Sequence, residues 1–427
     1  MKHNRTDNME SLSRRHFIRN SAAGMAAVMA GKSVLFAAQA KRKFRVALIG
    51  CGGRGNGALE NCFEAAEVLG VELEVVATAD WFKNRAVATG KKYNVPEARC
   101  FAGANGYKQL LDTNVEVVLM ATSPNFRPVH LDAAVRAGKH VFMEKPVAVD
   151  PPGGRKVIAA GEIAKQKGLA VVAGTQRRHQ AGYQRIKYAL ERGAIGEIAG
   201  GAVWWCGGAL WYKTKDPNES DADYMVRNWV SFTEMSGDHI VEQHVHNLDV
   251  ANWYIGRTPT SALGFGGRAR RKTGNQFDFF SLDLDYGDGL RIHSMCRQIN
   301  GTDGGVREFF RGTQGETWGG GGLKAAKEIE VPEFPDRNPY VQEHVNLLQS
   351  IMTGNPINEA HNVATSTLTA IMGRIAAYTG KLVRWKDVVE NESSPYYNLT
   401  LKPSAEDFEK GEVVAPLDDI AAVPGKD

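Results

Sequence analysis

Two histidines and two carboxylates recur at helical spacing near the middle of the chain. Steps of 3, 4 and 3 residues lead through His239, Glu242, His246 and Asp249. A helix would place all four on one face, with His244 pointing away. Such a face suits acid–base chemistry, with His246 as the general base and Glu242 orienting its imidazole. A polar interface stripe has the same spacing and is the alternative, whereas a helix splays His244 and His246 too far apart for one metal ion, so no metal site is predicted.

A lysine follows the short apolar segment 140–143, which is typical of a buried strand. In Glu144-Lys145-Pro146 the ammonium group would lie at the end of that strand, where it could stabilise an oxyanion that develops as hydride leaves a hydroxyl carbon. Proline could fix the turn, as a cis bond, and aim the lysine. Taken alone, the tripeptide is more typical of a charged loop.

A glycine-rich turn separates the apolar residues 44–49 from a helical pattern. Its first glycine permits the tight turn, its second lets backbone approach a pyrophosphate, and its third allows close packing of helix on strand. The helix amino terminus adds N–H donors and positive potential. The turn predicts a dinucleotide site made of Gly50, Cys51, Gly52, Gly53, Arg54 and Gly55.

Further cofactor contacts are expected at the ends of the next two strands. Asp80 lies about 25 residues beyond Gly55, where a carboxylate binds ribose hydroxyls and repels a 2′-phosphate. This favours NAD, although Lys83 and Arg85 could still hold the phosphate of NADP. Ligands of such sheets bind at the carboxyl ends of the strands. We therefore expect cofactor contacts from Thr122, Ser123, Pro124 and Glu144, together with Lys145.

Apolar segments and helical patterns alternate up to residue 174, which predicts an α/β fold with a doubly wound dinucleotide-binding domain at 43–174. Residues 175–390 have longer, partly alternating segments that predict a second α/β domain with a large, mostly antiparallel sheet. The glycine-dense residues 301–322 are expected to be loops, and the extension 391–427 to be surface coil from Lys402 onward. The predicted strands are 44–49, 73–79, 115–121, 140–143, 169–173, 197–205, 261–268, 277–286 and 289–297, and the main helices 129–137, 153–167, 183–192, 340–352 and 364–378.

The first forty residues resemble an export signal. Arg14-Arg15 and a following Phe-Ile precede a mildly apolar stretch and the small-x-small pattern Ala38-Gln39-Ala40, in the order typical of a twin-arginine signal. We therefore predict export, with the twin-arginine machinery as a partner and a periplasmic location. A basic, frayed amino terminus or an uncleaved anchor is the alternative.

Composition and charge limit the kinds of binding partner that the sequence predicts. Of the 52 Lys/Arg and 48 Asp/Glu residues, six and two respectively lie in residues 1–40, so the remainder carries equal numbers of basic and acidic side chains. This neutral balance of charge does not predict a nucleic acid as a binding partner. No apolar run reaches the length of about 18 residues that a membrane helix needs. The five scattered cysteines contain no C-x-x-C and favour free thiols over a disulfide framework.

Taken together, these motifs resemble the glucose–fructose oxidoreductase / inositol dehydrogenase / MocA (Gfo/Idh/MocA) family over nearly all of residues 43–390. The resemblance rests on the glycine turn, on residues 137–146 ending in Glu-Lys-Pro, on residues 193–197, on Glu242-x-x-x-His246-x-x-Asp249 and on the late helix 367–374. It implies a Rossmann domain, a second domain with an open sheet often used for homo-oligomerisation, and a catalytic group of Lys145, Glu242 and His246.

Two departures from the family pattern concern the substrate. Glu242 stands where the family usually has Asp, and His244 stands where Gly is usual. The predicted substrate-binding residues are Arg178, Tyr183, Trp229, His244, His246 and Asp249, because polar groups would bind hydroxyls and aromatic rings would stack on sugar C–H faces.

The leading hypothesis is an oxidoreductase that moves a hydride between a sugar or polyol carbon and tightly bound NAD. The second is an NAD-dependent enzyme that cleaves glycosides by transient oxidation, elimination, hydration and re-reduction. Such a redox-neutral cycle would suit an exported protein with no free NAD pool. The third is a non-catalytic sugar-binding protein on the same scaffold, since fold alone does not fix function.

Overall fold

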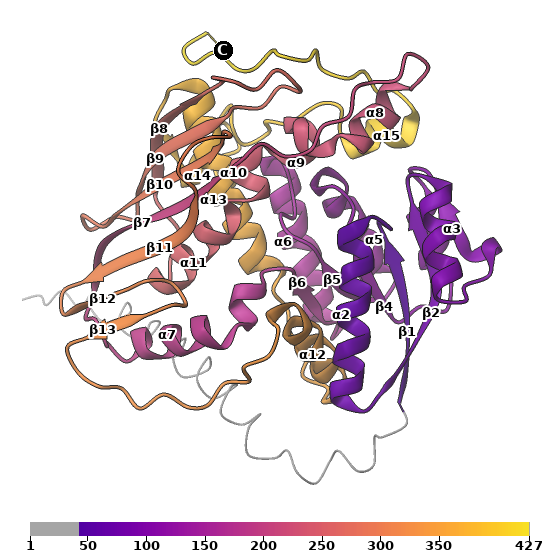
Figure 1. Cartoon of the computed structure of the whole chain (residues 1–427), viewed down its shortest axis with the longest axis horizontal. Helices are drawn as coiled ribbons and strands as arrows, with labels where there is room; N and C mark the ends of the chain where they lie inside the picture. The colour runs from indigo at the N-terminus through magenta and orange to yellow at the C-terminus, as the bar shows by residue number, and fades with distance from the viewer. Residues whose placement is uncertain (1–41, 427) are drawn as a thin grey trace, which may run out of the picture.

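Two β-sheets organise the chain, one in each half (Figure 1). The computed structural model describes residues 42–426. The predicted export signal therefore lies outside the described residues.

The first sheet is parallel and has the order β3-β2-β1-β4-β5-β6. Its inner strands are apolar and buried, as expected for a sheet covered by helices on both faces. The order reverses between β1 and β4, whose carboxyl ends therefore flank a crevice of the kind in which doubly wound sheets bind ligands. The predicted doubly wound domain is thus confirmed. Its strands are β1 (Lys43–Ile49), β2 (Glu72–Asp80), β3 (Cys100–Ala102), β4 (Val117–Met120), β5 (His140–Met143) and β6 (Val171–Ala173).

Helices from two distant parts of the chain cover this sheet. Helix α12 (Pro339–Met352) packs beside α2, and its side chains Val345 and Leu348 join the core beneath β1. The predicted boundary near residue 174 therefore separates two parts of the sequence, but residues from both sides of it pack in one hydrophobic core. The local helices are α2 (Gly53–Leu69), α3 (Lys83–Lys92), η1 (Glu97–Arg99), α4 (Gly106–Leu111), η2 (Pro124–Phe126), α5 (Arg127–Arg136) and α6 (Pro151–Gln166).

The second sheet has the order β13-β12-β11-β7-β10-β9-β8-β14, and only β7 and β10 pair in parallel. The expectation of loops at 301–322 was wrong, because β11 and β12 lie there. Glycine in this segment serves close strand pairing: a Cβ at Gly315 would lie 2.3 Å from the carbonyl oxygen of Lys324 on the neighbouring strand. The strands are β7 (Ile198–Gly207), β8 (Ser261–Gly267), β9 (Phe279–Asp285), β10 (Arg291–Gln298), β11 (Gly305–Gly312), β12 (Gly315–Thr317), β13 (Leu323–Ala325) and β14 (Val383–Arg384).

Helix α13 joins the two halves. Its first turns pack in the core of the first sheet and its later turns under the second sheet. Together α11 and α13 cover one face of the second sheet, while the other face exposes Leu263 and Phe265. The remaining helices are η3 (Gln176–His179), α7 (Ala181–Glu191), α8 (Asp221–Arg227), η4 (Trp229–Ser231), α9 (Thr233–Ser236), α10 (His239–Glu242), α11 (Val245–Ile255), α13 (Ala360–Thr379) and α14 (Trp385–Val389).

The carboxyl-terminal extension is more than the predicted coil. It contains the short helix α15 (Ala405–Lys410), which begins with a capping box between Ser404 and Asp407. Phe408 on this helix is only 2% exposed. Figure 1 shows α15 lying beside α8, above the carboxyl edge of the first sheet.

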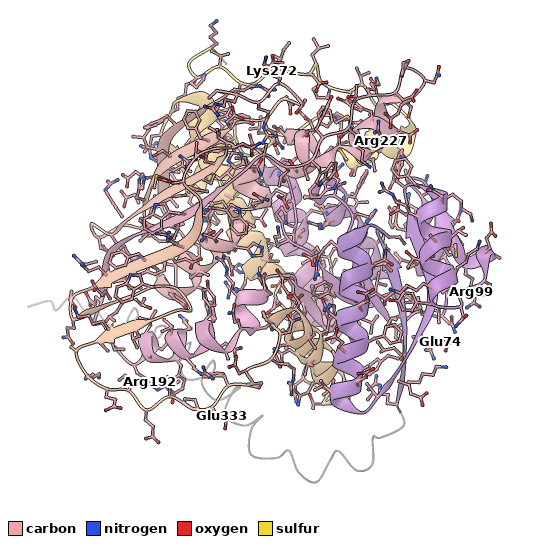
Figure 2. All side chains as sticks on the ribbon, viewed as in Figure 1. Glu74, Arg99, Arg192, Arg227, Lys272 and Glu333 are labelled. Carbon is pink, nitrogen blue, oxygen red and sulfur yellow. The ribbon has the colours of Figure 1, made fainter. Side chains whose placement is uncertain are left out.

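The surface is charged and mixed in sign. Figure 2 shows Glu74, Arg192 and Glu333 at the outer edge of the molecule. Within residues 42–426, no helix is long and apolar enough to cross a membrane. The same residues contain no cluster of His, Cys, Asp or Glu that could hold a metal ion, and all five cysteines have free thiols.

Candidate active site

The glycine turn has the shape that a pyrophosphate requires. Gly50 adopts φ 95°, and a Cβ there would lie 2.6 Å from the backbone of Ala121. At Gly55 a Cβ would lie 1.8 Å from the carbonyl oxygen of Gly50, whereas Gly52 and Gly53 have nothing within 4 Å of theirs. The first turn of α2 carries no acidic residue and no side-chain cap. Its free N–H groups and open glycines therefore fit a bound anion.

Replacing Gly55 with alanine is expected to disrupt this turn. Because the new methyl group would overlap backbone, α2 must move away from β1, and we expect dinucleotide binding to weaken by at least about tenfold, a cost of about 1.4 kcal/mol. Gly57→Ala is the matched control, since its Cβ would meet only the Arg54 guanidinium at 3.6 Å. Equilibrium titration of both variants with NADH checks the prediction, and equal affinities would contradict it.

Asp80 lies at the end of β2 and braces the turn. Its carboxylate accepts hydrogen bonds from the backbone N–H groups of Cys51, at 2.7 Å, and Phe82, at 2.9 Å. Burial raises the pKa of Asp80, and the two N–H donors oppose that shift. The carboxylate is thus at the predicted strand end, and it also joins β2 to the glycine turn.

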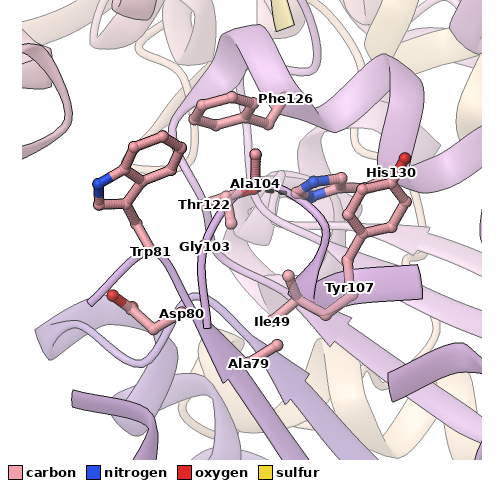
Figure 3. A pocket seen from close by; sticks show the side chains of 10 residues that line it. All are labelled: Ile49, Ala79, Asp80, Trp81, Gly103, Ala104, Tyr107, Thr122, Phe126 and His130. Atoms are coloured by element: carbon pink, nitrogen blue, oxygen red, sulfur yellow. Dashed lines mark hydrogen bonds between the residues drawn. The ribbon is translucent and has the colours of Figure 1, made fainter. Parts of the chain in front are cut away.

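A hollow opens beside Asp80 at the carboxyl edge of the sheet (Figure 3). Trp81 and Phe126 form aromatic walls whose ring centroids are 6.4 Å apart. Tyr107 and His130 form another part of the lining, and Thr122 Oγ1 lies 3.4 Å from His130 Nδ1. Flat aromatic walls next to the carboxylate predicted to bind ribose are the kind of surface on which an adenine ring stacks.

The sequence prediction missed these aromatic walls. The tryptophan directly after the strand-end aspartate was the feature of the sequence that could have indicated them. Ser123 and Pro124, which were predicted as cofactor contacts, lie at the start of η2, where Ser123 Oγ is 2.9 Å from Asn125 Oδ1. Both are buried.

Lys145 extends from the end of β5 toward the second domain. Its Nζ donates to the backbone oxygen of Glu242 at 2.6 Å and to Glu242 Oε1 at 3.2 Å. The Lys145–Pro146 bond is cis. Both side chains of this ion pair are 14% exposed, so the charge pair is largely shielded from water and still reachable.

Glu144, the residue before this lysine, is held by Arg54 of the glycine turn. Their side chains form an ion pair, and Arg54 also lies 3.6 Å from the fully buried Glu343. A Cβ at Gly174 would come within 2.5 Å of the Glu144 carboxylate. Arg54 and Glu144 therefore connect the predicted pyrophosphate turn with the strand that carries Lys145.

His246 lies in the first turn of α11, near this lysine. Its ring stacks on Trp205 with the centroids 5.7 Å apart. Burial lowers the pKa of His246 well below its usual value, and the positive charges of Lys145 and Arg177 lower it further. The imidazole is therefore neutral at neutral pH and ready to accept a proton. The unprotonated base thus lies four residues beyond Glu242, the residue that the Lys145 ammonium group contacts.

The predicted single helix through these residues is wrong. It breaks into α10 and α11, and the N–H of His244 donates to the His239 oxygen five residues back, at 3.2 Å. His239 consequently faces Asp238, with 2.9 Å between ring and carboxylate. Within residues 42–426 the Glu242 carboxylate hydrogen-bonds Lys145 and not His246, so its orienting action falls on the lysine.

Three predicted substrate contacts are turned inward instead. Arg178 forms a bidentate ion pair with Asp249, which is 1% exposed and also accepts from Ser366 at 2.7 Å. His244 is fully buried, with Nε2 2.8 Å from Ser294 Oγ. These side chains hold elements together, a role that sequence spacing does not show because it does not reveal which polar groups satisfy one another.

Tyr183 and Trp229 stay partly accessible. The Tyr183 hydroxyl donates to Glu308 at 3.1 Å, and Trp229 packs against the apolar cluster around Tyr224 and Phe232. Glu308 is a buried hub that also pairs with Arg177 and accepts from Asn247 at 2.7 Å. It escaped prediction because it lies in the segment expected to be loops.

Buried histidines near the site make stability depend on pH. His344 packs on Phe142, is fully buried, and has a pKa lowered by burial to about 3. A lowered histidine pKa means that stability is complete above the unfolded pKa near 6.5 and is lost as pH falls toward 3, by about 1.4 kcal/mol per pH unit for one residue.

The variant His344→Leu tests this dependence. The free energy of unfolding of this variant, relative to that of the wild type, should rise by about 1.4 kcal/mol for each unit by which the pH is lowered from 6 to 4. The control is His361→Leu, at an exposed position near the start of α13. Urea unfolding at several pH values measures the difference, and parallel pH curves for His344→Leu and the wild type would refute the assignment.

Comparison with known proteins identifies the family of both domains. A family model described as an oxidoreductase family with an NAD-binding Rossmann fold matches residues 44–175. A second model, the GFO/IDH/MocA C-terminal domain, matches residues 183–317. The two matches together include more than half of the chain and every catalytic residue predicted above.

Curated relatives align over part of their length. The chain is 27% identical over 238 residues to 2,7-anhydro-N-acetylneuraminate hydratase of Escherichia coli, covering 52% of this chain and 59% of the relative. It is 36% identical over 126 residues to inositol 2-dehydrogenase of Salmonella paratyphi B, covering 29% of this chain and 36% of the relative. The chain thus spans well under two thirds of these relatives.

Solved structures share the fold over most of the chain. The WlbA dehydrogenase from Bordetella pertussis, in complex with NADH and UDP-GlcNAcA, superposes with a TM-score of 0.64 at 18% sequence identity. The superposition covers 80% of this chain and 99% of that protein. With both family models matched and both domains superposed, the chain belongs to the Gfo/Idh/MocA family, whose Rossmann domain binds NAD.

Proposed function

We propose that this protein transfers a hydride between a hydroxyl-bearing carbon of a sugar or polyol and bound NAD. The observation that carries the proposal is the contact of Lys145, from the first domain, with Glu242 of the second, four residues before the buried His246. The nicotinamide, when bound, supplies the hydride acceptor. Relatives named inositol 2-dehydrogenase support a polyol or sugar substrate.

The residues of this chain account for the proton and the charge. His246, neutral because of its low pKa, removes the hydroxyl proton as hydride leaves the same carbon, so an alcohol becomes a carbonyl. Lys145 donates a hydrogen bond to the developing alkoxide. Glu242 holds the lysine ammonium in place, and the Trp205 ring beside His246 offers an apolar face to sugar C–H groups.

The test begins with the cofactor. The purified protein is denatured, and the released dinucleotide is identified; we expect NAD, because Asp80 stands where a 2′-phosphate would be repelled. Sugars and polyols are then screened for a change in nicotinamide absorbance. Stoichiometric reduction of bound NAD by a polyol supports the proposal, and a protein that binds no nicotinamide dinucleotide overturns it.

A second candidate is redox-neutral cleavage of a glycoside. A family relative is named a hydratase, and transient oxidation would acidify the C–H next to the new carbonyl so that the aglycone can leave. Water then adds, and the carbonyl is reduced again. Release of aglycone without net change in nicotinamide absorbance would favour this candidate over the dehydrogenase.

We also propose export through the twin-arginine route. The signal pattern at residues 12–40 motivates this proposal. Expression with Arg14→Lys/Arg15→Lys should leave the protein in the cytoplasmic fraction, whereas the wild type should reach the periplasm. Equal distribution of the two proteins would refute export by this route.

The open face of the second sheet is proposed to bind a second copy of the chain. Leu263, Phe265 and Trp318 are 47%, 66% and 46% exposed on or beside this sheet, and such patches on soluble proteins mark interaction surfaces. Phe265→Asp is therefore expected to shift the protein from dimer or tetramer toward monomer in sedimentation velocity. A wild type that sediments as a monomer would overturn this proposal.

A further inference from the structure

Residues of the carboxyl-terminal extension pack against the side chains that line the hollow proposed for adenine. Phe408 of α15 packs edge-on against Trp81, at 5.6 Å between centroids, and against Phe126, at 5.1 Å. Those two rings are walls of the hollow in Figure 3. Phe408, which is itself 2% exposed, is therefore buried against both of these rings.

A second contact fixes the opposite part of the lining. Glu409 accepts a hydrogen bond from the Tyr107 hydroxyl at 2.8 Å and pairs with Lys108 at 2.7 Å. Tyr107 lines the same hollow and packs on His130, with the centroids 4.2 Å apart. Two consecutive residues of α15 therefore touch three of the aromatic side chains around the hollow.

The extension is anchored on both sides of α15. Before the helix, the N–H of Leu401 donates to Asp150 at 3.0 Å. After it, the N–H of Ala415 donates to Asp221 at 2.8 Å. Asp221 begins α8, which also reaches the hollow because Asp223 accepts from the Trp81 indole. Trp81 is thus held by α8 and by α15 at once.

We propose that the extension completes the adenosine site and keeps the dinucleotide bound through repeated turnovers. This inference rests on the proposed function, because it takes the hollow to bind the adenosine of NAD. Phe408 and Glu409 act as positioning residues, since they hold Trp81, Phe126 and Tyr107 against the ring. Escape of the adenosine requires these walls to part, and hence requires α15 to separate from them.

A retained dinucleotide constrains the reaction. A nicotinamide that never leaves must return to its starting redox state on the enzyme. Each oxidation of a hydroxyl carbon is then followed at the same site by reduction of a carbonyl, which belongs either to a second sugar or to the first product. The hydride taken from one carbon is delivered to the other, so the two half-reactions balance without an external oxidant.

The test measures release of the cofactor and not activity. Full-length protein loaded with NADH is mixed with excess NAD, and the loss of bound NADH fluorescence gives the dissociation rate. The double variant Phe408→Ala/Glu409→Gln is expected to release NADH about 100-fold faster, since most changes in affinity arise in the dissociation rate. The control Glu406→Gln changes a residue of the same helix, α15, whose carboxylate pairs with Lys156 of α6 at 3.5 Å, and it should release NADH at the wild-type rate.

The outcomes separate this inference from the proposed function. If wild-type protein binds NADH but releases it as fast as the folded double variant does, the proposed role of the extension is wrong. The proposed oxidoreductase function is not affected by that result. Protein that binds no nicotinamide dinucleotide overturns both. If the double variant fails to fold, Glu409→Ala alone removes the acceptor of the Tyr107 hydroxyl and leaves Phe408 in place. It is still expected to speed release several-fold, and an unchanged rate would overturn the proposed role of the extension.

Discussion

Lys145→Ala is expected to lower kcat about 10²–10³-fold, because removal of one donor to a developing oxyanion typically has this effect. The ammonium group contacts Glu242 where the two domains meet, and its charge is only partly hydrated there. Since the side chain is not part of either hydrophobic core, Tm should change little, and dinucleotide loading is measured in parallel because Lys145 is also a predicted cofactor contact. Steady-state kinetics of the loaded enzyme with its best polyol or sugar provide the measurement.

Lys139→Ala is the matched control for this prediction. Lys139 lies just before the opposite end of β5, where its Nζ donates to the Val115 oxygen at 3.0 Å. It should leave kcat unchanged. If Lys145→Ala stayed folded and loaded with dinucleotide yet turned over like the wild type, the lysine would have no catalytic role.

His246→Phe is expected to lower kcat about 10²–10⁴-fold, the usual contribution of a general base. Phenylalanine preserves the stack on Trp205, so substrate packing should survive while proton removal does not. In the wild type, the lowered pKa of His246 places the acidic limb of the kcat/KM profile below pH 6.5. Activity is full above that limb and falls as the imidazole becomes protonated.

The pH profile separates catalysis from structure. A merely structural His246 would affect Tm without moving an acidic limb of kcat/KM. His293→Phe, at an exposed position of β10, is the control and should retain both the rate and the profile. A wild-type profile whose acidic limb lies above pH 7 would contradict the neutral, buried base.

The sequence by itself determined the first domain and its ligand turn. Short apolar runs and helical patterns are local, and Gly55 is needed locally because a Cβ there would lie 1.8 Å from the carbonyl oxygen of Gly50. Lys145 was located by the same logic, since the end of a buried parallel strand is a ligand-binding edge. These features could be predicted because each depends on neighbouring residues along the chain.

Only the tertiary structure decided which polar side chains face the site. Asp249, at helical spacing from His246, and Arg178 look like substrate contacts in the sequence, but they form a bidentate ion pair with each other. Glu242 turned to the lysine because α10 ends at that residue, a break that no glycine or proline announces. Phe408 and Trp81 meet across more than three hundred residues. Such pairings are selected by burial and charge compensation between distant segments, and these are properties of the packed chain rather than of any local pattern.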